Sequence, residues 1–397
     1  MHSRILRIIR LFGPAWIVML ADMDASSIIG AAQLGAIFQY GFIWFLMLLV
    51  IPLYFVQEAS GRIGAVTGEG LGATIRKYYS KRIAAVMTIP MFLTDIVTYV
   101  AEFLGIAIGL EILGVPIIFG IAVAYIVFLW VVTRNEYEYA EKVLLVISGI
   151  LILGLLSTLL LRGVKAYPLF AFNFTHLYLF MIAATVGAVV MPFMLFFQAS
   201  ATSEKMKEMS GKIPVDEVLK ESKENTFVGA IVTELLMIVV EMTFSGIPNA
   251  HSGTFASAQS FAGVLQPIAG SFSPYVFGIG LMAAGFLALV VVALASAWGV
   301  AEALKIKNKT ALFIMESLPA FALAILLPPS SLISSVMSFL VVFVFVLIGP
   351  VIILGMIAQN KKIMGQHAFS RGESVAYWCS SLMILAFGIA SAIFSLI

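Results

Sequence analysis

Residues 21–27, with the sequence ADMDASS, interrupt the first long apolar segment of the chain near its middle. Asp and Ser side chains compete for backbone hydrogen bonds and weaken a helix. Four such residues among the six positions 22–27 therefore predict a local break. Inside a bilayer, unwound backbone is tolerated only where it lines a cavity or is buried in protein. The stretch predicts a polar centre within an all-α integral membrane protein.

The whole chain, including this first segment, predicts eleven membrane spans. Of its 397 residues, 61% are apolar and 11% are charged, and the mean hydropathy is +1.07. A span needs about 20 apolar residues to cross the hydrocarbon core. Such segments lie at 13–38, 41–61, 84–110, 115–133, 142–161, 176–200, 226–247, 273–300, 310–328, 332–358 and 375–396, and the largest loops are 201–225 and 248–272.

The basic residues indicate the orientation of these spans. If the N-terminus is cytoplasmic, all of the 23 Lys and Arg except Arg162 and Lys165 fall on the cytoplasmic side. Basic residues gather in cytoplasmic loops of membrane proteins, so we expect a multi-pass cell-membrane protein whose C-terminus is outside. The charges are scattered among loops, which argues against nucleic-acid binding. The chain is expected to lie in the lipid bilayer, and no obligatory protein partner is predicted.

Several carboxylates lie at membrane depth, where an ionisable group costs at least about 2.5–3.5 kcal/mol and needs a partner or a wet cavity. No Lys or Arg is expected at similar depth, so the buried field suits a cation. For all but two of these acids, protonation or bonding to a neighbouring helix is the favoured interpretation. The six acids are Asp22, Asp24, Asp95, Glu102, Glu234 and Glu241.

A second break is predicted at residues 187–192, GAVVMP. Pro192 removes one helix hydrogen bond and frees a carbonyl near Ala188. Spans one and six would be the first helices of two five-helix halves, and broken helices in matching positions indicate the central site of a transporter.

Together the two breaks offer hard and soft metal donors. Asp24 supplies a carboxylate, Ala188 and Ala25 supply carbonyl oxygens, and Met191 supplies a thioether. Oxygen donors suit Mg²⁺, Ca²⁺ or Mn²⁺, whereas a thioether favours softer transition metals. Most of the 19 methionines will only fill gaps in packing, so the case for Met191 depends on its place beside Pro192.

At these residues the chain resembles the natural resistance-associated macrophage protein (Nramp) family of divalent-metal transporters. The most specific match is QEASGRIGAVTG at 57–68, and AEFLG at 101–105 is similar to the family's Ala-Glu-Val-Ile-Gly. MPFMLFFQAS at 191–200 corresponds to the family's Met-Pro-His-Asn-Leu-Tyr-Leu-His-Ser. Asp24-Ala25-Ser26-Ser27 stands where the family has Asp-Pro-Gly-Asn.

The resemblance implies one transporter domain with a LeuT-type fold and a midplane site that opens alternately to either side. Two inverted repeats would cover 13–161 and 176–358, and 375–396 would be an extra helix. The implied metal-binding residues are Asp24, Ser27, Ala188 and Met191, and Glu102 is the implied proton-route acid. The resemblance implies no cofactor, because the metal ion is the transported substrate.

The chain departs from the family pattern at several of these positions. Ser27 replaces an Asn ligand, Phe193 and Gln198 replace two histidines, and Tyr99 replaces a second acid of span three. Histidine exchanges protons most readily near neutral pH. Its loss predicts weak or absent proton cotransport.

Two functional hypotheses stay open, and two further classes are disfavoured. The first is transport of a divalent metal ion, Mn²⁺ or a similar first-row ion. The second keeps the fold but changes the substrate to Mg²⁺, a monovalent ion or a small organic or anionic solute. A sensor would need an appended domain, for which the chain has no room. An enzyme would need a nucleophilic or His-rich constellation, and neither Ser-His-Asp nor Cys-His spacing is present.

Overall fold

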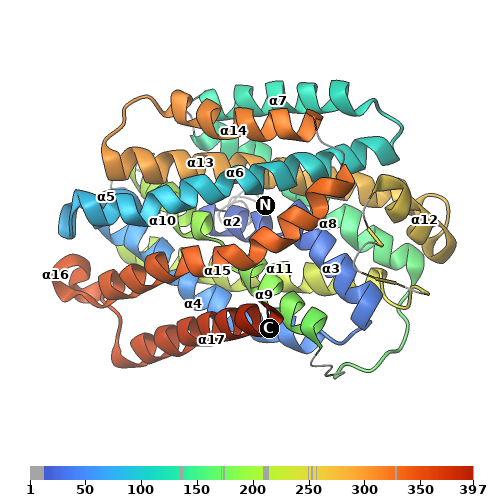
Figure 1. Cartoon of the computed structure of the whole chain (residues 1–397). Coiled ribbons are helices and arrows are strands. Elements are labelled where there is room, and N and C mark those ends of the chain that lie inside the picture. Colours follow the sequence, from blue (N-terminus) through green and yellow to red (C-terminus); the bar gives the residue numbers. More distant parts are fainter. Residues whose placement is uncertain are drawn as a thin grey trace, which may run out of the picture.

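The computed structural model describes residues 13–134, 137–170, 172, 175–208, 214–248, 250–251, 254–255, 257–326 and 329–396. In this part of the chain all regular elements are helices (Figure 1). The spans are formed by α2 (Pro14–Ala21), α3 (Ala25–Phe38), α4 (Ile43–Thr67), α6 (Lys81–Ile112), α7 (Ile117–Thr133), α8 (Tyr137–Arg162), α9 (His176–Val189), α10 (Pro192–Glu208), α11 (Val215–Thr243), α13 (Ser273–Leu304), α14 (Lys309–Leu326), α15 (Pro329–Gln359) and α17 (Arg371–Leu396). The connecting helices are α5 (Leu71–Tyr78), α12 (Ala258–Ala269), α16 (Lys361–Met364) and the 3-10 turn η1 (Gly365–His367).

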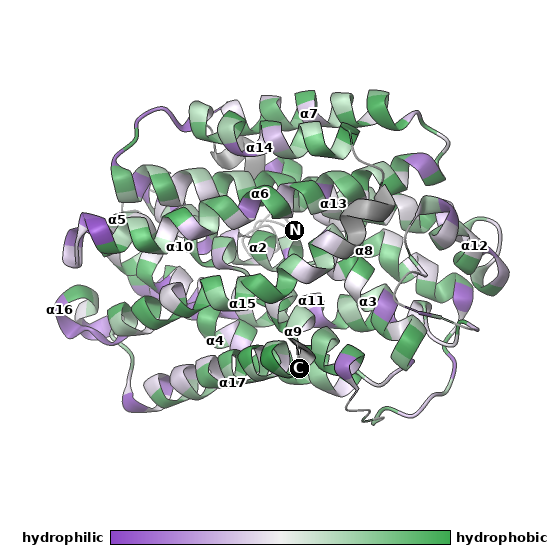
Figure 2. Cartoon of the chain, viewed as in Figure 1, coloured by the Kyte–Doolittle hydropathy of each residue, from purple (hydrophilic) through white to green (hydrophobic). Residues whose placement is uncertain are grey.

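The predicted membrane-protein class is confirmed. Within the described ranges, 9 helices are long and apolar enough to cross a bilayer, and the count reaches 10 when the bent pair α2 and α3 is taken as one span. α7 covers the predicted span 115–133 but is a shorter apolar helix. Its side chains nevertheless face outward, since Ile118, Phe119 and Ile126 are each about two thirds exposed. Figure 2 shows such apolar residues along the outer helices, as a lipid-facing surface requires.

The two long loops expected from hydropathy contain more helix than predicted. α10 runs on to Glu208 and α11 begins at Val215, so both extend into the polar segment 201–225. The segment 248–272 includes α12, whose first turn is capped by Ser257 through a 3.2 Å bond from the Ser260 N–H. Hydropathy detects only the apolar part of a helix, which explains why the polar extensions were missed.

The helix containing the first break lies in the middle of the bundle. α2 is central in Figure 1, α7 and α14 lie together at one edge, and α17 lies at the opposite edge. Small residues allow close approaches between the inner helices: a Cβ added at Gly64 of α4 would lie 2.2 Å from the carbonyl oxygen of Ala199 in α10. Small residues serve this purpose at helix interfaces in membranes.

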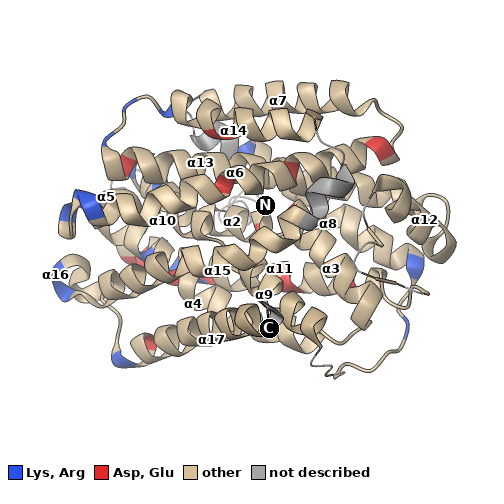
Figure 3. Ribbon diagram, viewed as in Figure 1, with Lys and Arg blue, Asp and Glu red and all other residues tan. Residues whose placement is uncertain are grey.

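Figure 3 shows Lys and Arg mainly at helix ends and in connections such as α5 and α16, with several acids on the inner helices. This charge pattern agrees with the basic loops read from the sequence. The predicted repeat boundaries, 13–161 and 176–358 with the extra helix 375–396, stay a prediction.

Candidate functional site

The predicted break in the first span is present. α2 ends at Ala21, α3 begins at Ala25, and the two helices are bent by 50°. Asp24 is the N-cap of α3, and its Oδ1 accepts bonds from the Ser27 N–H at 2.6 Å and the Ser26 hydroxyl at 2.8 Å. The polar residues that weaken the helix at this point therefore also start its second half, as N-cap side chains do.

Glu102 of α6 lies against the same break. Its Oε2 accepts a bond from the Ala25 N–H at 3.1 Å, and α6 can come this close because a Cβ at Gly105 would lie 2.2 Å from that of Ala25. The carboxyl groups of Glu102 and Asp24 are electrostatic neighbours. Both lie at the N-terminus of α3, where the helix dipole favours negative charge.

Some oxygens at this break have no hydrogen-bond partner among the described residues. They are Asp24 Oδ2, Ser27 Oγ and Glu102 Oε1, all buried. A buried carboxylate oxygen without a donor is costly unless a cation or a proton neutralises it. The arrangement can therefore accept a positive ion.

The predicted break in span six is also present, although residues 176–207 still form one apolar span. α9 ends at Val189, Val190 is extended with φ −128° and ψ 90°, and α10 begins at Pro192. Pro192 has no N–H to donate to the carbonyl of Ala188. Met191 lies between the helices and is 1% exposed, so its thioether is inside the protein rather than in lipid.

The structure brings part of the predicted ligand set together around one small cavity. Ser27 and Ala188 line a cavity of about 10 Å³ that also borders Ser26 and Thr185, and this volume is close to that needed by one water molecule. Asp24 and Met191 are also buried, and each is three residues along the chain from Ser27 or Ala188. Neither of them lines the cavity. Within the described ranges, no three His, Cys, Asp or Glu side chains group as metal ligands.

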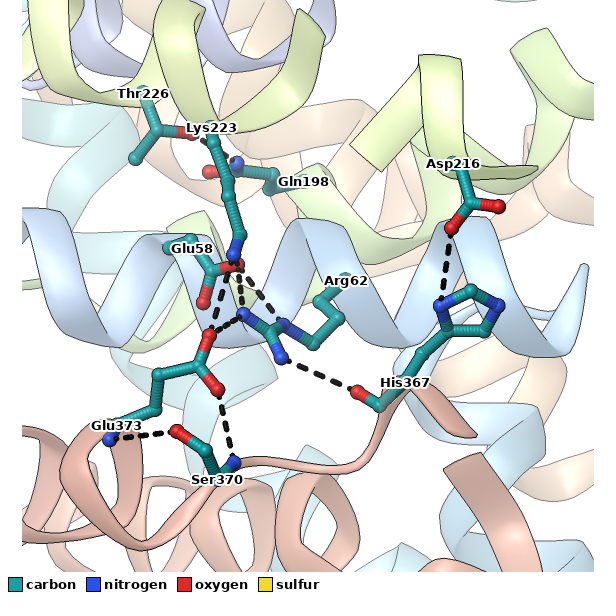
Figure 4. A network of polar contacts seen from close by, with 9 residues as sticks. All are labelled: Glu58, Arg62, Gln198, Asp216, Lys223, Thr226, His367, Ser370 and Glu373. Carbon is teal, nitrogen blue, oxygen red and sulfur yellow. Dashed lines mark hydrogen bonds and ion pairs between the residues drawn. The ribbon is translucent and has the colours of Figure 1, made fainter. Parts of the chain in front are cut away.

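The residues that replace the family's histidines are buried and fill other roles. Phe193 is fully buried. Gln198 donates from Nε2 to the Thr226 hydroxyl at 2.9 Å (Figure 4). Neither side chain exchanges protons near neutral pH.

Sequence reasoning left out two acids of its own predicted spans, Glu58 of α4 and Glu316 of α14. The carboxyl group of Glu316 is fully buried. Its Oε1 accepts a bond from the Ser296 hydroxyl at 2.5 Å and its Oε2 one from Tyr99 at 3.5 Å. Asp95 is an electrostatic neighbour of the same carboxyl group. Glu316 lies inside the predicted span 310–328, so a check of every acid in the spans would have found it.

Sequence reasoning also did not single out the buried ion pair of Glu58 and Arg62 near the end of α4. Arg62 is 5% exposed and donates from Nε to Glu58 Oε1 at 2.9 Å. The two residues are one helical turn apart on α4, where side chains meet. The sequence pattern Glu-x-x-x-Arg at 58–62 was the available signal.

Arg62 is the centre of a network that joins α4, α11 and α17 (Figure 4). Its Nη2 donates to Glu373 Oε1 at 2.5 Å, and Lys223 of α11 lies 3.2 Å from the same oxygen. Glu373 Oε2 accepts the Ser370 N–H at 2.9 Å, and the Ser370 hydroxyl accepts the Glu373 N–H at 3.3 Å. This reciprocal pair is a capping box, so the network fixes the first turn of α17.

Comparisons with known proteins agree with this architecture. The "Divalent metal cation transporter MntH" of Verminephrobacter eiseniae is 25% identical over 70% of this chain, and the match spans 65% of that protein. The protein of the same name from Yersinia pestis is 26% identical, over 72% of this chain and 71% of its own length. The crystal structure of the Eremococcus coleocola manganese transporter with an aromatic bis-isothiourea compound has a TM-score of 0.82 and 15% identity, covering 100% of this chain and 88% of that one.

At that identity the solved structure shows the fold, which is the predicted LeuT-type arrangement of Nramp transporters. The family itself is shown by a sequence model described as natural resistance-associated macrophage protein-like, which matches residues 15–393. Since this match runs through nearly the whole chain, including both breaks, the protein belongs to the Nramp family.

Proposed function

We propose that this protein carries a divalent metal ion, Mn²⁺ or a similar first-row ion, across the cell membrane by alternating access. The observation that carries the proposal is Asp24: a fully buried carboxylate at a helix break, with one oxygen engaged in capping and Oδ2 without a partner among the described residues. The relatives named as divalent metal cation and manganese transporters support the same substrate class.

In this proposal each break contributes donors. Asp24 and the hydroxyl of Ser27 bind from the start of α3, while the carbonyl of Ala188 and the thioether of Met191 bind from the interruption between α9 and α10. Met191 favours a softer ion such as Mn²⁺ over Mg²⁺. Ser27 is a shorter donor than an amide, so hydration water completes the coordination sphere. No cofactor and no protein partner is needed.

The orientation of the chain in the membrane decides which half-helix faces each side. With the N-terminus cytoplasmic and the C-terminus outside, α2 lies on the cytoplasmic side of Asp24 and α3 on the outer side. The 50° bend between them lets one half move while the other stays packed. Such movement of half-helices around a fixed site is how carriers of this architecture alternate.

Proton cotransport is weak or absent in this proposal. Phe193 and Gln198 cannot exchange protons near neutral pH, and Glu102 is left as the candidate proton acceptor beside Asp24. Ser27 supports the altered-substrate hypothesis, because its hydroxyl is a shorter and weaker oxygen donor than the amide that the family has at this position.

The proposal is tested with purified protein in liposomes. We expect saturable Mn²⁺ uptake and a matching saturable heat of binding, both lost in Asp24→Asn, which keeps an acceptor for the Ser27 N–H. Asp216→Asn, the same substitution at an exposed position, is the control and should transport normally. Saturable binding of Mg²⁺ or a monovalent ion without any Mn²⁺ signal would replace this proposal by the altered-substrate one.

A further inference from the structure

A second pair of carboxyl groups lies on the α2 side of the break, across from Asp24. Asp22 is the C-cap of α2, Glu234 belongs to α11, and the two are electrostatic neighbours. Their side chains are 2% and 0% exposed. Asp22 Oδ1 and both oxygens of Glu234 have no hydrogen-bond partner among the described residues. Three carboxylate oxygens are therefore directed into the protein without a donor.

The local backbone explains why these side chains meet. At the end of α2 the Met23 N–H bonds to the Leu20 carbonyl rather than to that of Met19. The Thr233 hydroxyl donates to the Met19 carbonyl instead, at 2.5 Å. This bond places Thr233 against the backbone of α2 three residues before Asp22, and Glu234 is the next residue of α11.

Close packing holds the two helices in this register. A Cβ at Gly229 of α11 would lie 2.7 Å from Cγ of Met19, so α11 passes α2 at nearly the shortest distance that side chains allow. The break in span one thus has two acidic sides: Asp24 with Glu102 of α6, and Asp22 with Glu234 of α11.

The described part of the chain provides no cation to balance Asp22 and Glu234. The buried basic side chains there are Arg62 and Arg162. Arg62 is engaged with Glu58 and Glu373, and Arg162 donates to the Ser245 carbonyl. Two adjacent carboxylates shielded from water repel each other and lose their hydration. Only a bound cation or protons can balance them.

We propose that Asp22 and Glu234 form a second cation site, which receives the transported divalent ion after it leaves Asp24. This inference rests on the proposed function. Two carboxylates match the charge of a divalent ion, and an oxygen-only donor set suits Mn²⁺ or Mg²⁺ without selecting a soft metal. The site is therefore less selective than the one that contains Met191.

The position of the pair gives it a place in the transport path. At the other end of α2, Pro14, Ala15 and Asn225 line a pocket between α2, α10 and α11. Along both helices, the contact between Met19 and Gly229 comes between the pocket residues Ala15 and Asn225 and the acids Asp22 and Glu234. If α2 swings away from α11, the same movement opens the contact and pulls Asp22 from Glu234, which releases the ion.

The test compares Glu234→Gln and Asp22→Asn with Glu241→Gln. Glu241 is a buried acid of the same helix, but its Oε1 accepts the Phe42 N–H at 3.0 Å, a bond that Gln can keep. We expect the first two variants to lower the maximal rate of Mn²⁺ uptake about tenfold while KM changes less than about twofold, because binding from outside still uses Asp24. Glu241→Gln should transport like the unaltered protein.

A binding measurement separates a metal site from a structural one. In the Asp24→Asn background, Mn²⁺ calorimetry should show a remaining weak, saturable site that disappears when Glu234→Gln is added. Loss of that weak site in a protein that still elutes as a single folded species supports the proposal. If Glu234→Gln fails to fold, Glu234→Asp, which keeps the charge on a shorter side chain, should show intermediate uptake and binding.

Three results would overturn the inference. The first is normal uptake in both acid variants, with no weak site in the Asp24→Asn background. The second is a weak site that survives Glu234→Gln while the pH dependence of uptake vanishes, which would assign protons rather than metal to the pair. In both cases an Asp24-dependent Mn²⁺ uptake would still stand. The third, no Mn²⁺ binding by the unaltered protein, would overturn the proposed function as well.

Discussion

Glu102 Oε2 accepts a hydrogen bond from the backbone N–H of Ala25 at 3.1 Å, so a carboxylate of α6 holds the first turn of α3 across 77 residues of sequence. Asp24 caps the same turn from within the chain. The candidate proton acceptor and the candidate metal ligand are thereby attached to one helix end. Any movement of that end affects both.

Glu102 should therefore help to hold Asp24 in position, in addition to contributing negative charge beside it. We expect Glu102→Gln, which keeps an oxygen for the Ala25 N–H, to retain most Mn²⁺ binding. Glu102→Ala should lose it, together with about 1 kcal/mol of stability, as removal of a capping acceptor does. Calorimetry and thermal unfolding in detergent provide the two measurements. Equal losses in both variants would show that the charge, rather than the bond, is needed.

Met191 should determine selectivity between soft and hard ions. In Met191→Leu, which nearly conserves volume, we expect Mn²⁺ and Cd²⁺ affinity to fall about tenfold or more while Mg²⁺ and Ca²⁺ are little affected. Competition of each ion against radioactive Mn²⁺ uptake measures this. Met194→Leu, a buried methionine one turn further along α10, is the control. A uniform loss for all four ions would remove Met191 from the ligand set.

Arg62 should be needed for stability at the end of α4. Arg62→Gln leaves buried Glu58 with only the longer contact to Lys223 at 3.8 Å. Breaking a buried pair from one side costs about 3–5 kcal/mol, so we expect a loss of stability toward the lower end of that range. Adding Glu58→Gln should restore much of this loss, because the two residues are coupled. Thermal unfolding of the single and double variants measures the effect. Lys77→Gln removes an exposed cation that pairs with Glu69 and lies over the Tyr78 ring. It should change stability little, because water screens such surface contacts.

Proton movement should not follow Mn²⁺ uptake closely. With a pH-sensitive dye inside liposomes, we expect little acidification during Mn²⁺ entry, because Phe193 and Gln198 replace the proton-exchanging histidines. Protein-free liposomes and the Asp24→Asn variant give the background. Acidification in strict proportion to the Mn²⁺ gradient would contradict the expectation and direct attention to Glu102.

The helix breaks could be predicted because their causes are local. Asp22, Asp24 and Ser26 compete with the backbone of their own turn, and Pro192 removes a bond from its own helix. Long apolar segments likewise reveal the spans without reference to any neighbour. The polar ends of α10 and α11 carry no such signal, so their bounds were misjudged.

The chain itself thus determined where helices cross the membrane, where two of them break and which donors stand at the breaks. Only the tertiary structure decided which charged residues meet: Glu234 with Asp22, Glu316 with Asp95, and Arg62 with Glu373, which is 311 residues away. The reason is physical. Helix formation depends on neighbours within a few residues, whereas contacts between helices depend on shapes and close approaches, such as Gly229 against Met19, that arise only after all of the helices have packed.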